Sequence, residues 1–442
     1  MSERKSTTDS SPSSSQTAVH YPVIVIGGGQ AGLAVSWCLK QRGIDHIVFE
    51  KSRIAEAWRT QRWDTFCLVT PNWQCQLPGF PYAGPDPNGF MLKKQIIEYI
   101  EAYVKSFSPP VMEGTTVKRL ARSGDRPFEI ETSYRNFTAD QVVVATGGYQ
   151  IATIPRMAEK FASDVKQLHS SAYTNPAALP PGAVLVVGSG QSGCQIAEDL
   201  HLAGRKTHLC VGGAPRTARC YRGRDVVDWL ADLGYYDMPV HEHPVKERVR
   251  AKANHYVTGR DGGRDIDLRK FAVEGMQLHG RLKDVQGTRI SFADDLAENL
   301  DKADNVADGI KNTIDKFIAE KGIEAPTEPR YVPVWKPENP PSEIDCVEAG
   351  ITSVIWSAGF RTDYSWIEVP LFDGKGYPVH QRGVTTVPGI YFLGLPWLYT
   401  WGSGRFSGIA RDAQFLADCI EARHVAGHGM EAPALNELAL GS

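Results

Sequence analysis

Two stretches of this chain show the same order of features: an apolar strand, a glycine-rich turn and then a helical pattern. The run Val23–Ile26 leads into Gly27–Gly32, and the run Ala183–Val187 leads into Gly188–Gly193; both turns read G-x-G-x-x-G. A continuous apolar run is typical of a parallel strand that is buried on both faces. A chain with two such openings is expected to be an α/β protein with two Rossmann-like dinucleotide-binding domains.

The first turn has the full context of a dinucleotide site. Gly27 is expected to make the tight turn, Gly29 to let the backbone approach a pyrophosphate, and Gly32 to let the helix pack on the strand. The pyrophosphate would lie at the helix N-terminus, where free N–H groups favour an anion. Glu50 ends the next strand, where a carboxylate accepts hydrogen bonds from ribose hydroxyls. These features predict an FAD site.

The second turn differs at the position that corresponds to Glu50, because Val211 stands there. A ribose with a free 2′-hydroxyl would lack its usual acceptor, whereas a 2′-phosphate would find Arg216 and Arg219 a few residues further on. This pattern favours NADPH over NADH. The alternative for either arginine is a solvated surface charge.

Composition limits the partners that the chain is expected to have. With 442 residues it exceeds the size at which one hydrophobic core keeps growing, so two domains are expected. The net charge of -3 gives no argument for nucleic acid as a partner. The eight cysteines form no C-x-x-C pair, and we predict reduced, mostly buried thiols in a cytoplasmic protein with no metal site. No apolar run approaches the length of a membrane span.

The domain organisation follows from where these patterns stand along the chain. Residues 1–19 are rich in Ser and Thr and are expected to be a disordered tail. We assign residues 20–160 and 346–442 to an FAD-binding domain and 161–345 to an inserted NADPH-binding domain. Within the insert, residues 221–345 are expected to form an elaborated cap or insertion. The segment from Asp294 to Lys321 has apolar residues at helical spacing, which indicates a packed helix over the substrate cleft or at a dimer contact.

The sequence resembles the flavin-containing monooxygenase superfamily, the class B flavoprotein monooxygenases, and especially its auxin-forming members. The resemblance rests on both glycine motifs, on Ala145–Gly148, on Ser357–Tyr364 and on the stretch from Trp58 to Pro81. Two further segments, Tyr221–Asp225 and Gly259–Asp265, are similar to a narrower bacterial subfamily that is encoded beside a nitrilase.

The motifs and the resemblance together imply the residues that bind each cofactor. The FAD candidates are Gly27, Gly29, Gln30, Ala31, Gly32, Glu50, Lys51, Trp58, Arg59, Ala145, Thr146, Gly147, Gly394 and Gly408. The NADPH candidates are Gly188, Gly190, Gln191, Ser192, Gly193, Arg216, Arg219, Ser357, Ala358 and Gly359.

The resemblance also implies an activity, in which NADPH reduces FAD and a flavin C4a-(hydro)peroxide then oxygenates a small organic substrate. N-oxygenation, S-oxygenation and Baeyer–Villiger chemistry remain open, because all three use the same flavin chemistry. The alternative is an NAD(P)H-dependent dehydrogenase, oxidase or reductase that inserts no oxygen. The catalytic candidates are Asn72, Trp401 and Arg405. The expected partners are O2 and the substrate, with neither nucleic acid nor a membrane, and a homodimer is compatible with the sequence.

Overall fold

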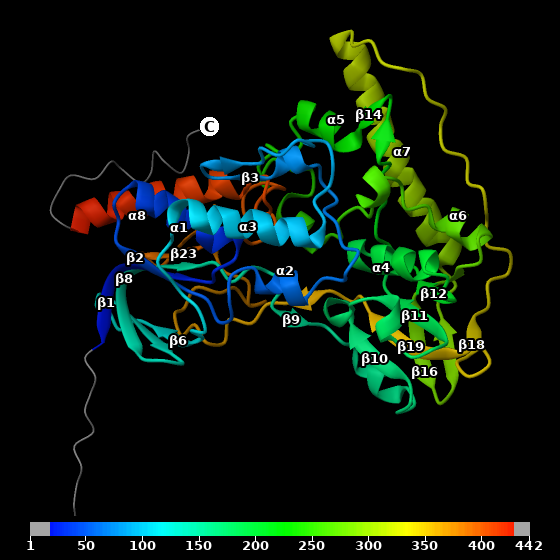
Figure 1. The fold of residues 1–442 in the computed structure, drawn as a ribbon, viewed down its shortest axis with the longest axis horizontal. Helices are drawn as coiled ribbons and strands as arrows, with labels where there is room; N and C mark the ends of the chain where they lie inside the picture. Colours follow the sequence, from blue (N-terminus) through cyan, green and yellow to red (C-terminus); the bar gives the residue numbers. More distant parts are fainter. Residues whose placement is uncertain (1–17, 428–442) are drawn as a thin grey trace, which may run out of the picture.

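The computed structural model describes residues 18–427, which form two lobes side by side (Figure 1). The first lobe contains a nine-stranded sheet whose main path runs β21-β22-β23-β8-β1-β2-β5, with β6 and β7 attached through β8. Strands β23, β8, β1, β2 and β5 are parallel, so β1 lies in the middle of a Rossmann-like sheet. The strands are β1 (Val19–Ile26), β2 (His46–Phe49), β5 (Val111–Met112), β6 (Val117–Ala121), β7 (Phe128–Thr132), β8 (Asn136–Val144), β21 (His380–Gln381), β22 (Val384–Thr385) and β23 (Ile390–Phe392).

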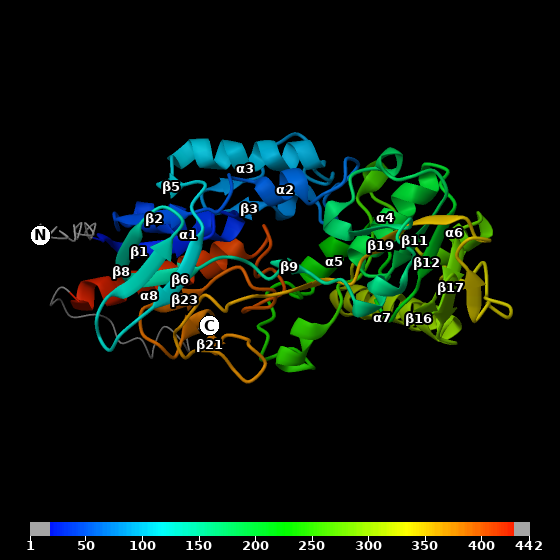
Figure 2. The ribbon, with the colours of Figure 1, turned by 90° about the horizontal axis from the view of Figure 1, so that it is seen from below.

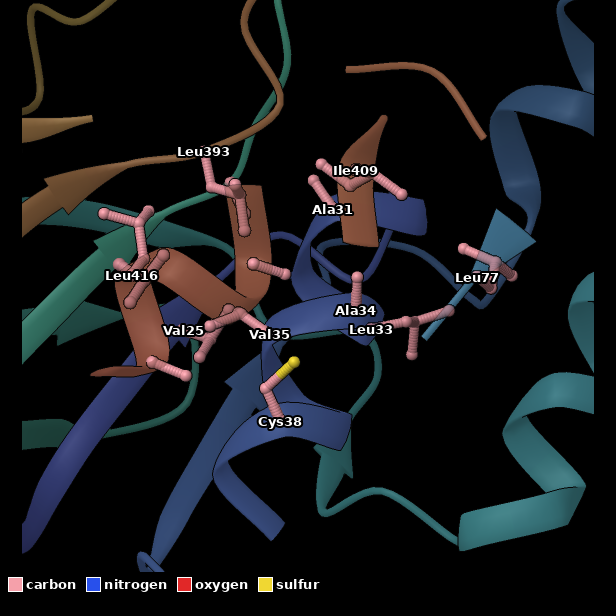
Figure 3. Packing of buried hydrophobic residues seen from close by; sticks show 14 of the residues in the cluster. Val25, Ala31, Leu33, Ala34, Val35, Cys38, Leu77, Leu393, Ile409 and Leu416 are labelled. Atoms are coloured by element: carbon pink, nitrogen blue, oxygen red, sulfur yellow. The ribbon is translucent and has the colours of Figure 1, made fainter. Parts of the chain in front are cut away.

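Successive side chains of β1 point to opposite faces of the sheet, and both faces are buried. Val23 and Val25 join the core under the helices, whereas Ile24 and Ile26 join the core on the opposite face. In Figure 3 helix α1 lies in the middle of the first core, with Leu33, Ala34 and Val35 among the side chains of the neighbouring elements. The helices of this lobe are α1 (Gln30–Gln41), α2 (Glu56–Thr60), α3 (Lys93–Phe107) and α8 (Ile409–Gly427), and a short hairpin joins β3 (Gln76–Leu77) to β4 (Phe80–Pro81).

The second lobe is built around an all-parallel sheet of five strands in the order β10-β19-β11-β12-β15. Strand β11 lies between β19 and β12, as β1 lies between β8 and β2 in the first sheet. The strands are β10 (Lys166–His169), β11 (Ala183–Val187), β12 (Thr207–Cys210), β15 (Gln277–His279) and β19 (Ile351–Trp356), and the helices are α4 (Gln191–Leu202) and α6 (Leu268–Val273). The predicted fold class, α/β with two Rossmann-like units, is confirmed.

Residues 221–345 are only partly an addition to this sheet. Strand β15 pairs with β12, so the predicted insertion includes one strand of the parallel sheet itself. The strand has three residues, which is too short for sequence periodicity to reveal. The rest of the region forms a hairpin, two helices and a three-stranded antiparallel sheet: β13 (Cys220–Tyr221), β14 (Arg224–Asp225), α5 (Val226–Asp232), α7 (Leu296–Lys321), β16 (Leu282–Gln286), β17 (Arg289–Phe292) and β18 (Glu343–Asp345).

Helix α7 confirms the packed helix that the sequence predicts. Ile314 and Ile318 pack with Trp229 of α5, and Leu296 and Leu300 join the core of the second sheet. The apolar stripe is therefore buried within the chain. Figure 1 shows α7 beside α5 at the outer side of the second lobe.

The chain passes between the lobes in both directions along one short antiparallel pair. Strand β9 (Ile151–Ala152) leads out of the first lobe and pairs with β20 (Phe360–Arg361), which leads back. Figure 2 shows β9 between the two lobes. The first strand begins at Val19, inside the predicted tail, because Val19 pairs with Phe137; residues 1–17 and 428–442 lie outside the described part.

Candidate dinucleotide sites

Of the three glycines that define the first G-x-G-x-x-G pattern, two are too closely packed for a side chain and one faces open space. Gly27 has φ +111°, and a Cβ there would lie 2.6 Å from the carbonyl oxygen of Ala145. A Cβ on Gly32 would lie 1.8 Å from the oxygen of Gly27, whereas a Cβ on Gly29 would meet no atom within 4 Å. Helix α1 begins at Gln30 with no side-chain cap, so its first N–H groups face that space. This geometry fits a pyrophosphate.

The second turn repeats this geometry closely. A Cβ on Gly188, at φ +104°, would lie 2.7 Å from the oxygen of Ser357, and a Cβ on Gly193 would lie 1.8 Å from the oxygen of Gly188. Gly190 again has no atom within 4 Å, and helix α4 has no side-chain cap. The turn thus brings Ser357 to the second site. The buried hydroxyl of Ser357 has no hydrogen-bond partner within residues 18–427.

Glu50 lies against the first turn, as the sequence predicts. Its Oε2 accepts a hydrogen bond from the N–H of Gly28 at 2.8 Å, and Oε1 accepts one from the N–H of Ser52 at 2.9 Å. These bonds fix the carboxylate, while each oxygen keeps a lone pair for a ribose hydroxyl. The neighbouring Lys51 is exposed.

Two further loops lie beside the first glycine turn at the carboxyl edge of the first sheet, one after β8 and one between β23 and α8. Thr146 and Gly147 follow β8, and a Cβ on Gly147 would meet no atom within 4 Å. Gly394 follows β23, and a Cβ there would lie 2.7 Å from the Cβ of Ala31 on helix α1. Gly408 packs against Gly402, because a Cβ on Gly408 would lie 2.6 Å from the carbonyl carbon of Gly402. The close approach that Gly408 permits is therefore within its own loop.

The FAD candidates Trp58 and Arg59 belong to the short helix α2 of the first lobe. The rings of Trp58 and Phe406 stack with centroids 5.7 Å apart, and Arg62 lies over Trp58. Arg59 makes an ion pair with Glu101 on α3. Trp63 is buried in the second core beside Tyr173, so packing accounts for it.

The three catalytic candidates have different surroundings. The buried amide of Asn72 accepts from the N–H of Met91 at 2.7 Å and donates to the oxygen of Asp86 at 2.9 Å. These contacts give Asn72 the role of a loop anchor and leave the catalytic suggestion without support. Trp401 and Arg405 stack on one another, with 4.1 Å between guanidinium and ring.

Arg405 carries a charge that no carboxylate neutralises in the described residues. Its guanidinium donates to the oxygen of Trp401 and, at 2.9 Å, to Oδ1 of Asn254. Burial lowers the pKa of Arg405 from its usual value. A half-buried cation of this kind fits an anionic group on a ligand.

Two groups that sequence reasoning missed lie at the start of helix α8. The hydroxyl of Ser407 is buried and has no hydrogen-bond partner within residues 18–427. Burial raises the pKa of Asp412 to about 6, although Ser403 and Arg382 oppose the shift. The sequence carries no signal for either group, because Ser407 and Asp412 are ordinary polar residues at the start of a helical pattern.

Arg216 and Arg219 are buried and paired, so neither is a solvated surface charge. The Nε atom of Arg216 lies 2.6 Å from Oδ1 of Asp304, and the Nε atom of Arg219 lies 3.1 Å from Oδ2 of Asp225. Gln191 is also engaged, because its amide bonds both backbone groups of Val257. Ser192, Ala358 and Gly359 are exposed beside the second turn.

The segment Gly259–Asp265 joins the two lobes. A Cβ on Gly259 would lie 2.1 Å from the oxygen of Leu68 in the first lobe. Arg260 bonds Asp199 at 2.8 Å, and Arg264 bonds Glu198 at 2.9 Å, both on helix α4. Burial raises the pKa of Glu198 to about 7, although the two arginines oppose the shift. This buried network fixes the second glycine turn relative to the first lobe.

The fold and the paired glycine turns define a two-dinucleotide oxidoreductase. Residues 24–268 match the family described as pyridine nucleotide-disulphide oxidoreductase, and the chain belongs to this family. A relative named "Uncharacterized oxidoreductase CzcO-like", from Geobacillus kaustophilus, is 35% identical over 402 residues, which cover 90% of this chain and 97% of the relative.

Further comparisons point to the flavin monooxygenases. The probable indole-3-pyruvate monooxygenase YUCCA4 of Arabidopsis thaliana is 31% identical over 192 residues, covering 42% of this chain and 46% of that protein. The solved flavin-containing monooxygenase from Stenotrophomonas maltophilia has a TM-score of 0.61 at 20% identity, covering 92% of this chain and 99% of that one. The predicted membership of the flavin-containing monooxygenase superfamily is confirmed, and the chain belongs to a family of oxidoreductases. The nitrilase-associated subfamily stays a prediction.

Two other features are absent from the part of the chain that the structure describes. Within residues 18–427, no cluster of three or more His, Cys, Asp or Glu side chains has an arrangement that could hold a metal ion. Among the described helices, none is long and apolar enough to cross a membrane.

Proposed function

We propose that this chain is an FAD- and NADPH-dependent monooxygenase that transfers one atom of O2 to a small organic substrate. The observation that carries the proposal is the matched geometry of Gly29 and Gly190, each open to a ligand at the uncapped start of a helix. Two dinucleotide sites in one chain imply hydride transfer between two cofactors. The relatives named as monooxygenases support oxygen transfer as the second half of the reaction.

The first lobe would hold FAD. Gly29 and the N-terminus of α1 would bind its pyrophosphate, and Glu50 would accept a hydrogen bond from its ribose. When bound, FAD would supply the hydride acceptor and the means of activating O2. We propose that this site belongs to a domain of residues 20–160 and 346–442, with the NADPH site on residues 161–345.

The chain's own contribution to the chemistry would come from the start of helix α8. The helix N-terminus and the charge of Arg405, which has no carboxylate partner among residues 18–427, would stabilise negative charge on a bound ligand. Ser407 would offer a hydroxyl at the same point. The stacked rings of Trp58 and Phe406 would keep water from the reacting atoms.

The buried cysteines argue against a dithiol reductase. All eight cysteines are free, and seven of them are buried. Burial raises the pKa of Cys67 to about 11 and that of Cys75 to about 12, so neither is a thiolate at neutral pH. A dithiol enzyme needs a reactive thiolate beside the flavin.

Anaerobic titration of the purified holoenzyme tests the two-cofactor proposal. We expect a protein that retains FAD and whose flavin absorbance is bleached by one equivalent of NADPH. Gly190→Ala should retain FAD but resist bleaching by NADPH, while dithionite still reduces its flavin. A protein that binds no flavin, or a Gly190→Ala variant that NADPH reduces as the wild type, would contradict the proposal.

A further inference from the structure

In each site, the ribose of the dinucleotide is expected at the end of the second strand, β2 in the first lobe and β12 in the second. The two strand ends differ in how they hold the glycine turn. At the first site the carboxylate of Glu50 bonds the N–H of Gly28. At the second site Ser189 takes this role, because its Oγ accepts a hydrogen bond from the N–H of Gly212 at 2.9 Å. The turn is thus held without a carboxylate, and the edge has no negative charge at that point to repel a phosphate.

The two arginines that follow β12 in the sequence already form ion pairs with aspartates of the chain. Arg216 and Arg219 are 5% and 2% exposed, and each is paired with a buried or half-buried aspartate. Arg216 also lies over the ring of Tyr331, 4.2 Å from its centroid. Turning either guanidinium toward a ligand would leave its aspartate without a partner in the interior, which is costly.

Arg281 lies at the same edge and has free donors. It follows β15, the neighbour of β12, and its Cγ would lie 3.9 Å from a Cβ built on Gly212. A Cβ on Gly213 would meet no atom within that distance. The side chain of Arg281 is 69% exposed.

Asp295 orients the Arg281 side chain from one side. Its Oδ1 accepts the backbone N–H of Arg281 at 2.9 Å, and its Oδ2 accepts the Nε–H. Neither Nη atom of Arg281 has a hydrogen-bond partner among residues 18–427. A guanidinium held through Nε presents its two Nη groups together, the arrangement that phosphate oxygens accept.

We propose that Arg281, oriented by Asp295, binds the 2′-phosphate of NADPH beside Gly212 and Gly213. The inference rests on the proposed dinucleotide site at Gly188–Gly193 and names the residue that makes that site select a phosphorylated ribose. It assigns to Arg281 the role that the sequence alone assigns to Arg216 and Arg219.

Calorimetric binding of 2′,5′-ADP and 5′-AMP to the holoenzyme tests the inference without turnover. These probes share the adenosine and the 5′-phosphate and differ in the 2′-phosphate. We expect the wild type to prefer 2′,5′-ADP by about 10–100-fold, the range of a charge-assisted contact. Arg281→Ala should remove this preference and leave 5′-AMP binding unchanged, and Arg281→Lys should keep part of it. Arg289→Ala, which removes an exposed arginine on the adjacent sheet, is the matched control and should bind as the wild type.

Three results would overturn the inference. Equal binding of the two probes by the wild type would show that the site does not read a 2′-phosphate. If Arg281→Ala still preferred 2′,5′-ADP, Arg281 would not be the residue that binds the 2′-phosphate. If, in addition, Arg216→Gln lost the preference, Arg216 would be that residue. Failure of both probes to bind would contradict the proposed dinucleotide site itself.

Discussion

The N–H of Gly28 donates to Oε2 of Glu50 at 2.8 Å, so the acid that is expected to bind ribose also closes the turn that is expected to bind pyrophosphate. Glu50→Ala should therefore weaken FAD retention. The loss of one charge-assisted bond, together with the unsatisfied N–H, is worth about 1.5–3 kcal/mol, or about a 10–150-fold rise in the FAD dissociation constant.

The ratio of flavin to protein absorbance after dialysis measures this effect. Asp45→Ala, which removes an exposed acid just before the same strand, serves as the control and should retain flavin. A Glu50→Ala protein that keeps its full flavin content would exclude Glu50 from the cofactor site.

Substitutions within one glycine turn should separate folding from binding. Gly190→Ala places a methyl group in open space at a φ of -68° and should leave the thermal stability unchanged while abolishing NADPH binding. Gly193→Ala drives the methyl group into the oxygen of Gly188 and should lower the stability by about 1–3 kcal/mol or more. Thermal unfolding and nucleotide binding, measured on both variants, check the distinction; equal behaviour of the two variants would refute it.

The ion pairs of segment Gly259–Asp265 should be worth far more than exposed pairs. Arg264→Ala removes the cation 2.9 Å from the carboxylate of Glu198, which is 2% exposed, and we expect a loss of about 1–3 kcal/mol in the free energy of unfolding. Glu298→Ala breaks an exposed pair with Lys302 on α7 and should cost no more than about 0.5 kcal/mol. Urea unfolding of both variants provides the comparison, and similar losses would show that the network does not hold the lobes together.

A buried histidine pair should make the protein less stable in acid. His208 and His279 stack with 5.2 Å between their centroids, and Nδ1 of His208 lies 3.0 Å from Nε2 of His279. Burial lowers the pKa of His208 to about 4 and that of His279 to about 3. The unfolded chain binds protons from about pH 6.5 downward and the folded chain does not, so stability present above pH 6.5 is lost as pH falls toward 4.

Each histidine contributes at most about 1.4 kcal/mol per pH unit to this loss. The variant His208→Phe/His279→Phe should show a flatter dependence of unfolding free energy on pH between 6.5 and 4. The same slope in wild type and variant would assign the acid sensitivity to other groups.

The sequence predicted those parts of the fold whose signals are local. The strands before Gly27 and Gly188 are continuous apolar runs, and each glycine with a positive φ stands at the turn. The pairing of β12 with β15 was not predictable, because a three-residue strand far along the chain carries no periodic signal of its own.

The site was predictable to a similar extent. Glu50 lies where the motif places it, because the spacing from the glycine turn is fixed by one helix and one strand. Arg216 forms an ion pair with Asp304, and Asn72 forms hydrogen bonds with Asp86 and Met91. Only tertiary packing brings these partners near, so the sequence does not reveal them. A charged or amide side chain in a suggestive position cannot be assigned to a ligand until its protein partners are known.

Oxygen transfer separates a monooxygenase from an oxidase, and rapid mixing of the NADPH-reduced holoenzyme with O2 is the direct test. We expect a transient absorbing species that precedes the return of oxidised flavin, with little H2O2 released and with NADP+ bound. Immediate reappearance of oxidised flavin with one equivalent of H2O2, unchanged when candidate substrates are present, would contradict oxygen transfer. That result would identify the chain as an oxidase or dehydrogenase that inserts no oxygen.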